Sequence, residues 1–498
     1  MKNLSRIISA FLAIVLLSAI VAGCGSEEEE DPGVTAGTFE DTADMTEETT
    51  VSDEPELPET DLEGREYQFL VRKGTHAYND HWIEVEDMNG EVVNDAVFER
   101  NRAVEEKFNV DITALFTETA DSYATKSVLA GDDSFFAVWE CKNSLATGIQ
   151  KNIYLDMNLL SYVDFTAPYW DKNAVEQLSI GNKLYMMPSD ISMGNLTAPR
   201  FLYFNKRIME NYGLKSPYDY VADDCWTLDN FLPMVAAVSA DLDGDGKMTR
   251  EDEFGMLRED GGANGNILYF LVGSGIRATT NDEDGIPQVS FFNDKTQTII
   301  DKVSVVFKDE NCTIEYNKCA SGADISQFDH LWDYCRSLFA AGHFLFVQNG
   351  CYETVQFNDM ADDYGIVPNP KYDENQKEYY HRTDPYNTQM AIPMTNVDLE
   401  NTGMILEWMS WKSHHTVLPA YYETTIKLKR QRDETAIEML DIIKGSMYYE
   451  ISDIFGLGVS DVLWNSYRTG DLASTYAKSE KSMQKKIDKL VDNLTDMG

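Results

Sequence analysis

The chain has 498 residues, more than the roughly 250 to 300 at which single hydrophobic cores stop growing, so we expect two or more packed units. Its 85 Asp and Glu residues outnumber its 41 Lys and Arg residues, which gives a net charge of −44. A surface this acidic repels a phosphate backbone, so no nucleic-acid partner is expected. The hydrophobic content of 43% is that of an ordinary globular protein, and no fixed-period repeat is visible, which disfavours solenoids and propellers.

The N-terminal segment predicts export. Lys2 and Arg6 precede the apolar run Ile7–Ala22, which is the layout of a secretory signal peptide. The run ends in Val-Ala-Gly-Cys at residues 21–24, which resembles the bacterial lipobox, where the cysteine receives a diacylglyceryl group. We therefore expect residues 1–23 to be a lipoprotein signal peptide and Cys24 to anchor the protein to the extracytoplasmic face of the cell membrane, carrying two acyl chains, enough for stable attachment.

The next segment has the composition of a linker. Residues 25–61 hold fifteen Asp or Glu residues, no Lys or Arg, and many Thr, Gly and Pro residues. Such a segment cannot bury enough apolar surface to fold. We expect residues 24–61 to be a disordered acidic tether that follows the lipidated cysteine.

Six cysteines remain in the body of the chain. An even number in an exported protein permits disulfides without specifying which of fifteen pairings forms, and buried free thiols are an equal alternative. Because the cysteines are scattered and contain no Cys-x-x-Cys pair, a metal cluster is not expected. They are Cys141, Cys225, Cys312, Cys319, Cys335 and Cys351.

The body begins near Leu62 with alternating strand and helix patterns. The aromatic and β-branched run Tyr67–Val71 predicts a strand, Asn94–Phe108 has the apolar spacing of a helix, and Val110–Thr113 returns to strand. A helical stretch up to about Leu129 and a strand at Phe135–Trp139 continue the alternation. This order favours an α/β fold with mostly parallel sheets covered by helices, whose ligands bind beyond the carboxyl ends of the strands.

Short motifs then carry a family resemblance. They are Lys183–Pro188 (KLYMMP), Arg200–Met209 (RFLYFNKRIM), Cys225–Phe231 (CWTLDNF), Tyr364–Pro368 (YGIVP) and Met390–Pro393 (MAIP). Together with the lipobox they resemble, in family order, the extracellular solute-binding proteins of the maltose-binding type (family 1), the substrate-binding lipoproteins of ABC importers. The resemblance is spread over nearly the whole chain, although each motif is short.

The resemblance implies a bilobal solute-binding domain over residues 62–498, built from discontinuous segments. The first lobe would comprise residues 62–190 and 388–413, and the second lobe residues 198–371 and 419–498. The crossovers would lie near Asp190–Ala198, Lys371–Thr388 and Ser413–Pro419. In such a fold the ligand bridges both lobes and stabilises a closed form that the importer's membrane permease subunits recognise. The resemblance thus implies a monomeric, non-enzymatic receptor.

Aromatic and polar residues near strand ends are the candidate ligand contacts, because sugars present apolar C–H faces and hydroxyl groups. The family position after a first-lobe strand falls on Trp139, Glu140 and Asn143, and the aromatic that follows the family's "N-G-x-W" strand corresponds to Tyr352. The loop after the first strand adds Tyr78, Asp80 and Trp82. Weaker candidates are Met193, Asn266 and Trp464. For each aromatic side chain the alternative is core packing.

The expected ligand is a carbohydrate, in particular an oligosaccharide. A peptide receptor or a surface adhesin of the same fold stays open as an alternative. A surface glycosidase is disfavoured because no nucleophile elbow, zinc helix or phosphate loop is present. A metal receptor built on His76 with His81, or on His414 and His415, is disfavoured because seven scattered histidines are ordinary background.

The segment from Asp241 to Asp252 fits the calcium loop of an EF-hand. Oxygen ligands stand at positions 1, 3, 5, 9 and 12 and the turn glycine at position 6, and the backbone carbonyl of position 7 completes the set. The residues in this order are Asp241, Asp243, Asp245, Thr249 and Asp252, with Lys247 supplying the carbonyl. We expect a structural calcium ion here; a solvated acidic turn is the alternative.

Overall fold

The computed structural model describes residues 53–73, 82–192, 194–261, 265–351, 357, 360–384, 387–422 and 435–495, with the backbone alone at 195, 196 and 495. The residues from Glu54 onward form one unit, which contains two larger sheets and two pairs of short strands. Among the described residues no helix is long and apolar enough to cross a membrane.

The first sheet has the strand order β13-β3-β1-β2. Its strands are β1 (Arg65–Arg72), β2 (Val110–Thr117), β3 (Ala137–Cys141) and β13 (Thr388–Ala391). Strand β1 pairs in parallel with β2 and β3, whereas β13 runs antiparallel to β3 with Gln389 opposite Glu140. A strand from late in the chain therefore completes a sheet that the N-terminal residues begin.

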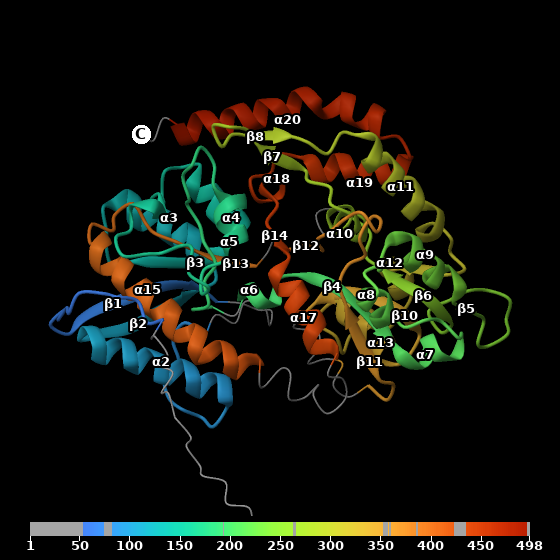
Figure 1. Ribbon diagram of the computed structural model, residues 1–498, viewed down its shortest axis with the longest axis horizontal. Coiled ribbons are helices and arrows are strands. Elements are labelled where there is room, and N and C mark those ends of the chain that lie inside the picture. The colour runs from blue at the N-terminus through green and yellow to red at the C-terminus, as the bar shows by residue number, and fades with distance from the viewer. Residues whose placement is uncertain are drawn as a thin grey trace, which may run out of the picture. The chain divides into compact units, whose positions relative to one another are not determined.

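Helices cover both faces of this sheet, and we call the whole the first lobe. They are α2 (Val92–Phe108), α3 (Ala120–Ala130), α4 (Lys142–Ile149), α5 (Lys172–Leu178) and α15 (Leu399–His415), with the short 3-10 helix η2 at Met157–Leu159. Figure 1 shows α2 on the opposite side of the sheet from α3 and α4. Helix α2 ends because Asn109 adopts a left-handed conformation (φ 50°), and the chain turns directly into β2.

The second sheet follows the order β11-β4-β10-β6-β5, with β9 also pairing with β6. Its strands are β4 (Arg200–Asn205), β5 (Ser239–Ala240), β6 (Glu253–Arg258), β9 (Thr313–Glu315), β10 (Phe344–Gly350) and β11 (Tyr364–Val367). Strand β10 is parallel to β6 and antiparallel to β4. All six residues of β4 and all seven of β10 are buried, as expected for central strands covered on both faces.

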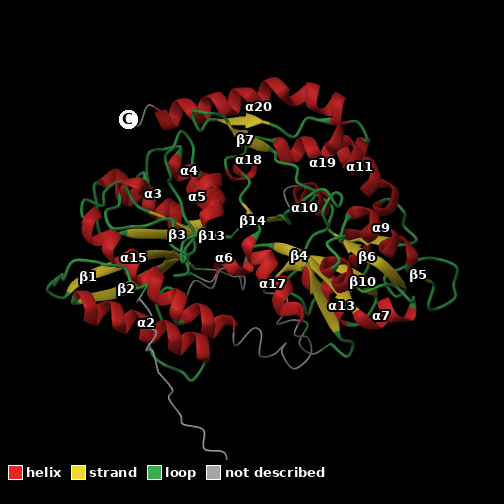
Figure 2. Ribbon diagram, in the orientation of Figure 1, coloured by secondary structure: helices red, strands yellow, loops and turns green. Residues whose placement is uncertain are grey.

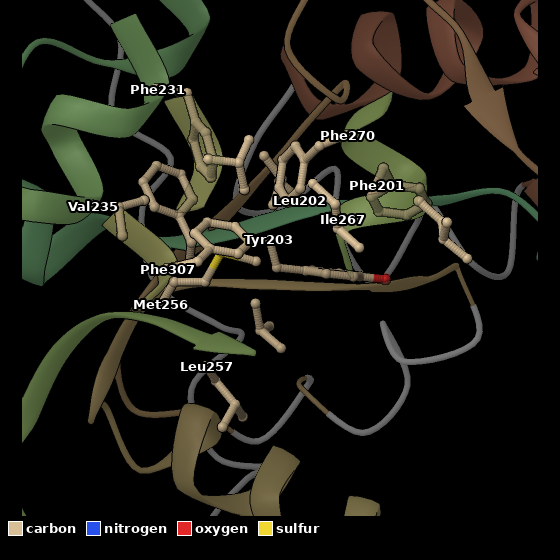
Figure 3. Close-up of a cluster of buried hydrophobic side chains, with 14 of the residues drawn as sticks. Phe201, Leu202, Tyr203, Phe231, Val235, Met256, Leu257, Ile267, Phe270 and Phe307 are labelled. Carbon is tan, nitrogen blue, oxygen red and sulfur yellow. The ribbon is translucent and has the colours of Figure 1, made fainter. Parts of the chain in front are cut away.

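We call this sheet and its helices the second lobe. The helices are α7 (Lys206–Asn211), α8 (Pro217–Ala222), α9 (Leu228–Ala237), α10 (Asn266–Gly273), α11 (Asp294–Phe307), α12 (Tyr316–Ala320), α13 (Leu331–Ala340), α17 (Thr435–Gly445) and α19 (Val459–Thr469). Its core is rich in aromatic rings (Figure 3): Phe231 and Phe270 stack with their centroids 5.1 Å apart, between α9 and α10.

Short elements lie between the two sheets. They are α6 (Gly194–Thr197), β12 (His381–Arg382), β14 (Met447–Tyr448) and α18 (Ile451–Ile454), and the hairpin β7 (Thr279–Asn281) and β8 (Pro287–Val289) adds a further pair of strands. Strand β12 pairs in parallel with β14, and Thr383 forms a bridge with Pro199 just before β4. Separate parts of the chain therefore cross between the sheets side by side.

The C-terminal helix α20 (Leu472–Thr495) runs along the top of the view in Figure 2, and its side chains contact both hydrophobic cores. Leu472 and Met483 pack with the second lobe, whereas Ile487, Leu490 and Leu494 pack with the first. The segment Met447–Leu457 also contributes side chains to the first core. The segment 419–498, which the sequence assigns to the second lobe, therefore divides its contacts between the lobes.

Candidate functional site

An aromatic pocket lies where the second sheet meets the crossing segments. Its cavity volume is about 20 Å³, room for about one water molecule, so a sugar could enter only if the walls move apart. We call it the aromatic pocket, and it is lined by Pro199, Phe201, Cys351, Tyr421, Tyr422, Leu440, Ile443, Lys444 and Met447. Its walls come from the start of β4, the residue after β10, the chain beyond α15, helix α17 and β14. It therefore adjoins two of the predicted crossovers, those near Asp190–Ala198 and Ser413–Pro419, while β14 pairs with β12 of the third.

One ring of the pocket lies beside a predicted ligand contact. Trp82 lies beside Tyr421 with the ring centroids 5.7 Å apart. Cys351 precedes Tyr352, which lies outside the described residues. Burial and nearby acidic groups raise the pKa of the Tyr422 hydroxyl, so this group stays protonated and can donate a hydrogen bond. The pocket thus combines apolar rings with polar tips, the chemistry expected of a sugar site.

A network of buried ion pairs lies at the crossovers. Arg200, the first residue of β4, pairs with Glu259 (Nη1 to Oε2, 2.6 Å) and with Asp384 (Nη2 to Oδ2, 2.9 Å). Arg382 pairs with Asp453. The ring of Tyr269 lies beside both arginines: the guanidinium groups of Arg200 and Arg382 lie 5.4 and 5.0 Å from its centroid.

Two further ionisable groups are fully buried beside this network. Lys142, the first residue of α4, donates from Nζ to the Thr383 hydroxyl at 2.7 Å, and burial lowers its pKa to about 7. Glu450 accepts hydrogen bonds from the backbone N–H groups of Ala278 and Ser452, and burial, followed by repulsion from Asp453, raises its pKa to about 7. Both groups therefore change charge near neutral pH at the crossing segments.

Unused polar groups lie on the segments near the end of β3 and the start of β13. Both amide atoms of Asn387 and both of Gln389 are buried without a hydrogen-bond partner in the described part of the chain. The same holds for Oδ1 of Asn143, at the start of α4. Because unsatisfied buried polar atoms are costly, they mark a place where a polar ligand can supply hydrogen bonds.

The predicted residues after β3 separate into different environments. Trp139 is 1% exposed and packs edge-on against Phe69 at 5.1 Å, inside the first core, which agrees with the core-packing alternative. Glu140 is buried, pairs with Arg72 at 3.3 Å, and accepts a hydrogen bond from the Asp121 backbone. Burial raises the pKa of Glu140. Of the three, only Asn143 keeps an unused polar atom among the described residues.

The other predicted ligand contacts are scattered. Asn266 is buried and satisfied: its Oδ1 accepts from the backbone of Glu259 and its Nδ2 donates to Gln348. Trp464 is half-buried in α19 beside Gly265. Tyr78, Asp80, Met193 and Tyr352 lie outside the described residues. The structure therefore brings Trp82 to the aromatic pocket and Asn143 to the unused amides.

Sequence reasoning did not select Tyr421, Tyr422, Asn387 or Gln389. The adjacent tyrosines just after the predicted crossover at Ser413–Pro419 were an available signal, since sites in two-lobed folds lie beside the crossovers. The amides carried no signal, because their lack of partners depends on tertiary contacts.

The loop Asp241–Asp252 has the backbone arrangement of a cation-binding loop. Carboxylate oxygens of Asp241, Asp243 and Asp252 lie within 4.8 Å of one another. Asp241 accepts hydrogen bonds from the backbone N–H groups of Gly244 and Gly246, each at 2.7 Å, and these bonds lower its pKa. Gly246 has φ +79°, which glycine adopts without strain. The donor set is all oxygen and fits calcium.

Cys225, Cys312, Cys319 and Cys335 are free thiols in this structure, and of the six cysteines of the body Cys225 alone is not buried. This corresponds to the free-thiol alternative.

Comparison with known proteins identifies the fold. No protein-family model matches the sequence, and no curated protein matches it. Among solved structures, a cyclo/maltodextrin-binding protein complexed with maltotetraose is 14% identical, covers 88% of this chain and 98% of its own, and has a TM-score of 0.54. RafE from Streptococcus pneumoniae in its apo form is 14% identical, with 87% and 98% covered and a TM-score of 0.51.

A sugar transporter from Rhizobium etli in an open conformation is 12% identical, with 86% and 99% covered and a TM-score of 0.52. Each alignment includes both sheets because it extends over most of this chain. The predicted α/β fold with two lobes is confirmed. The chain has the two-lobed fold of the sugar-binding ABC substrate-binding proteins, the maltose-binding type of solute-binding protein.

Proposed function

We propose that this protein captures a carbohydrate, in particular an oligosaccharide, between its two lobes and delivers it to an ABC importer. The observation that carries the proposal is the fold, in which separate crossing segments join two sheets and an aromatic pocket adjoins those segments. The similar structures include proteins described as binding maltotetraose and as a sugar transporter. They are described as binding or transport proteins and not as enzymes, which supports a receptor.

The chemistry of the pocket supports a sugar more than a peptide. Aromatic faces of Tyr421 and Trp82 suit the apolar C–H face of a sugar ring. The unused amides of Asn387 and Gln389 can each donate to and accept from hydroxyl groups. A peptide receptor of the same fold is the alternative, and the first experiment separates the two.

The N-terminal sequence supports a membrane-tethered receptor. We propose that Cys24 is lipidated after export and that the acidic residues from there up to residue 53 form the tether. Glu54 already pairs with Lys107 of the first lobe, so the ligand-binding body beside the permease subunits of the importer would begin at Glu54. The run Ile7–Ala22 and the fifteen acidic residues of positions 25–61 are the basis. The lobe boundaries, the extracytoplasmic location and the monomeric state belong to the same proposal.

We also propose that the loop Asp241–Asp252 holds a structural calcium ion. Its residues lie in the second lobe, away from the aromatic pocket lining, so calcium would stabilise the loop without touching the ligand. Asp241, Asp243, Asp245, Thr249 and Asp252 would supply side-chain oxygens and Lys247 its carbonyl oxygen, which is the EF-hand arrangement with Asp in place of Glu at position 12.

The first experiment is thermal unfolding of the purified full-length protein with a panel of mono- and oligosaccharides and a matched panel of peptides. A ligand at 100 times its dissociation constant stabilises the folded state by about 2.7 kcal/mol, which shifts the melting temperature measurably. A shift with one sugar class supports the proposal. A shift with peptides alone contradicts it.

A matched pair of variants locates the site. Tyr421→Ala with Tyr422→Ala is expected to weaken sugar binding at least about tenfold, because the stacking faces are lost. Trp332→Ala removes an aromatic side chain that is 40% exposed outside the aromatic pocket, and it is expected to leave binding unchanged. Equal affinity in both variants would place the ligand elsewhere.

A further inference from the structure

A second, larger pocket lies on the second lobe and is lined by different residues from the aromatic pocket. Its volume is about 550 Å³, within the range of small-molecule sites. We call it the cationic pocket, and it is lined by Gly275, Ile276, Arg277, Thr280, Ser290, Asn293, Asp294 and Lys295. It is formed by the turn after α10, by β7 and by the first residues of α11.

Arg277 lines this pocket, and one nitrogen of its guanidinium group is buried without a partner among the described residues. Its guanidinium carbon lies 3.9 Å from the ring centroid of Tyr380 and 4.1 Å from that of Tyr448. The two rings contact the guanidinium group, yet among the described residues no hydrogen bond or ion pair is made by its N–H groups, and Nη1 is buried without a partner. Arg277 is half-buried, whereas the buried Arg200 and Arg382 pair with carboxylates.

Lys295 supplies a second cation to the same pocket. Its ammonium lies 4.7 Å from the ring centroid of Tyr372 and makes no hydrogen bond or ion pair with any residue that the structure describes. A Cβ atom added to Gly275 would lie 3.5 Å from Nζ of Lys295, so the ammonium sits against the pocket floor. Burial, together with the charge of Arg277, lowers the pKa of Lys295, whereas Asp373 raises it.

The remaining groups of the pocket suit an anion. Helix α11 has 14 residues and begins at the pocket edge, where Asn293 caps it by accepting from the backbone of Thr296 at 3.0 Å. The hydroxyl groups of Thr280 and Ser290 add polar contacts. Asp294 is the one carboxylate of the lining, so the two cations outnumber it. The charge of Asp373 acts on Lys295, but no direct ion pair to either cation is made within the described part of the chain, so an anion could supply that contact.

We propose that the cationic pocket is a second ligand site that binds a small oxyanion, either a carboxylate such as that of an acidic sugar or a phosphate. Arg277 would offer two parallel N–H groups to two oxygens of the anion, and Lys295 would add a point charge. The site is separate from the proposed sugar site, because no residue lines both pockets.

The location connects this site to the crossing segments. Tyr380 directly precedes β12 and Tyr448 belongs to β14, and these two strands pair between the sheets. An anion that fixes Arg277 between both rings would therefore bind where the crossing strands are held together.

The test is isothermal titration calorimetry on the purified full-length protein at low ionic strength, with inorganic phosphate, glucuronate and glucose as probes. We expect phosphate or glucuronate to bind and glucose to give no signal at this site. Arg277→Gln and Lys295→Gln should each weaken anion binding about tenfold or more. Lys302→Gln, two turns along α11, serves as control because Lys302 contacts the same Tyr372 ring but pairs with Asp229 at 2.7 Å.

Retained binding in the control with loss in Lys295→Gln supports the proposal, even where Arg277→Gln is too unstable to measure. Absence of binding by both anions to the unaltered protein overturns it. An equal loss in Lys302→Gln also overturns it, because the effect then reflects surface charge in general. None of these results changes the outcome of the thermal-unfolding test with sugars. Each of the two proposals can therefore be contradicted without the other.

Discussion

Two buried ionisable groups are expected to make the free energy of unfolding depend on pH near neutrality. Glu450 is fully buried and its pKa is raised from 4.5 to about 7, so the folded state holds its proton more tightly than the unfolded state. The stabilisation is complete below about pH 4.5 and is lost as the pH rises toward 7. Lys142 acts in another window: with its pKa lowered to about 7, the folded state gains stability as the pH rises from 7 toward 10.5.

The Glu450→Gln variant tests this reading. The free energy of unfolding of the variant minus that of the unaltered protein is expected to rise by a few kcal/mol between pH 5 and pH 8. One pKa unit corresponds to about 1.4 kcal/mol. Urea unfolding at a series of pH values measures the change. A difference that stays constant from pH 4.5 to pH 8 would show that Glu450 has an ordinary pKa.

At some glycine positions another backbone segment lies too close for a side chain. A Cβ atom at Gly403, in α15, would lie 1.9 Å from the carbonyl oxygen of Ser161. We expect Gly403→Ala to cost about 1 to 3 kcal/mol or more, since the helix must move away from that segment. Gly445→Ala at the end of α17 is the control, because no atom lies within 4 Å of its added Cβ. Chemical unfolding of both variants tests the difference, and equal stabilities would contradict it.

At the scale of elements, the loop Asp241–Asp252 is expected to gain stability from calcium. Removing calcium with a chelator should lower the melting temperature, and adding it back should restore the transition. Asp252→Asn should abolish the calcium effect, because Asp252 is fully buried and its carboxylate lies beside those of Asp241 and Asp243. An unchanged melting temperature on chelation and re-addition would support a solvated turn that binds no ion.

Helix α20 is the element through which both cores meet. Ile487 is 1% exposed in the first core, and Met483, one turn earlier, belongs to the second. Ile487→Ala is expected to cost about 2 to 5 kcal/mol from lost burial and the cavity left behind. Lys485→Ala, on the exposed face of the same helix, should change stability by less than about 0.5 kcal/mol. Similar losses in the two variants, measured by urea unfolding, would contradict this packing.

At the scale of the whole molecule, ligand binding is expected to bring the lobes together. A sugar that contacts both lobes binds the closed arrangement more tightly and shifts the population toward it. Small-angle scattering should show a smaller radius of gyration with the sugar that raises the melting temperature than without it. The Tyr421→Ala and Tyr422→Ala double variant should show no change at the same sugar concentration, and an unchanged radius in the unaltered protein would count against closure.

Local patterns predicted the elements of the first lobe closely. The predicted strand Tyr67–Val71 is β1 (Arg65–Arg72), and the predicted helix Asn94–Phe108 is α2 (Val92–Phe108). The strand expected at Phe135–Trp139 begins two residues later, at Ala137, because Phe135 and Phe136 pack into the core before the ladder starts. Periodicity indicates which side chains are apolar on one face, and it leaves the ends of an element loosely defined.

Residues adjacent in the chain were enough to predict an export signal, an acidic tether, an α/β alternation and a loop with the spacing of a calcium site. The side chains that meet across long separations depend on the folded chain. Trp139 lies in a core, Trp82 lies beside Tyr421, and the amides of Asn387 and Gln389 have no partner among the described residues. Burial and pairing depend on contacts between distant segments, and a strand ending such as Trp139–Glu140 has the same local pattern whether its ring faces a ligand or the core.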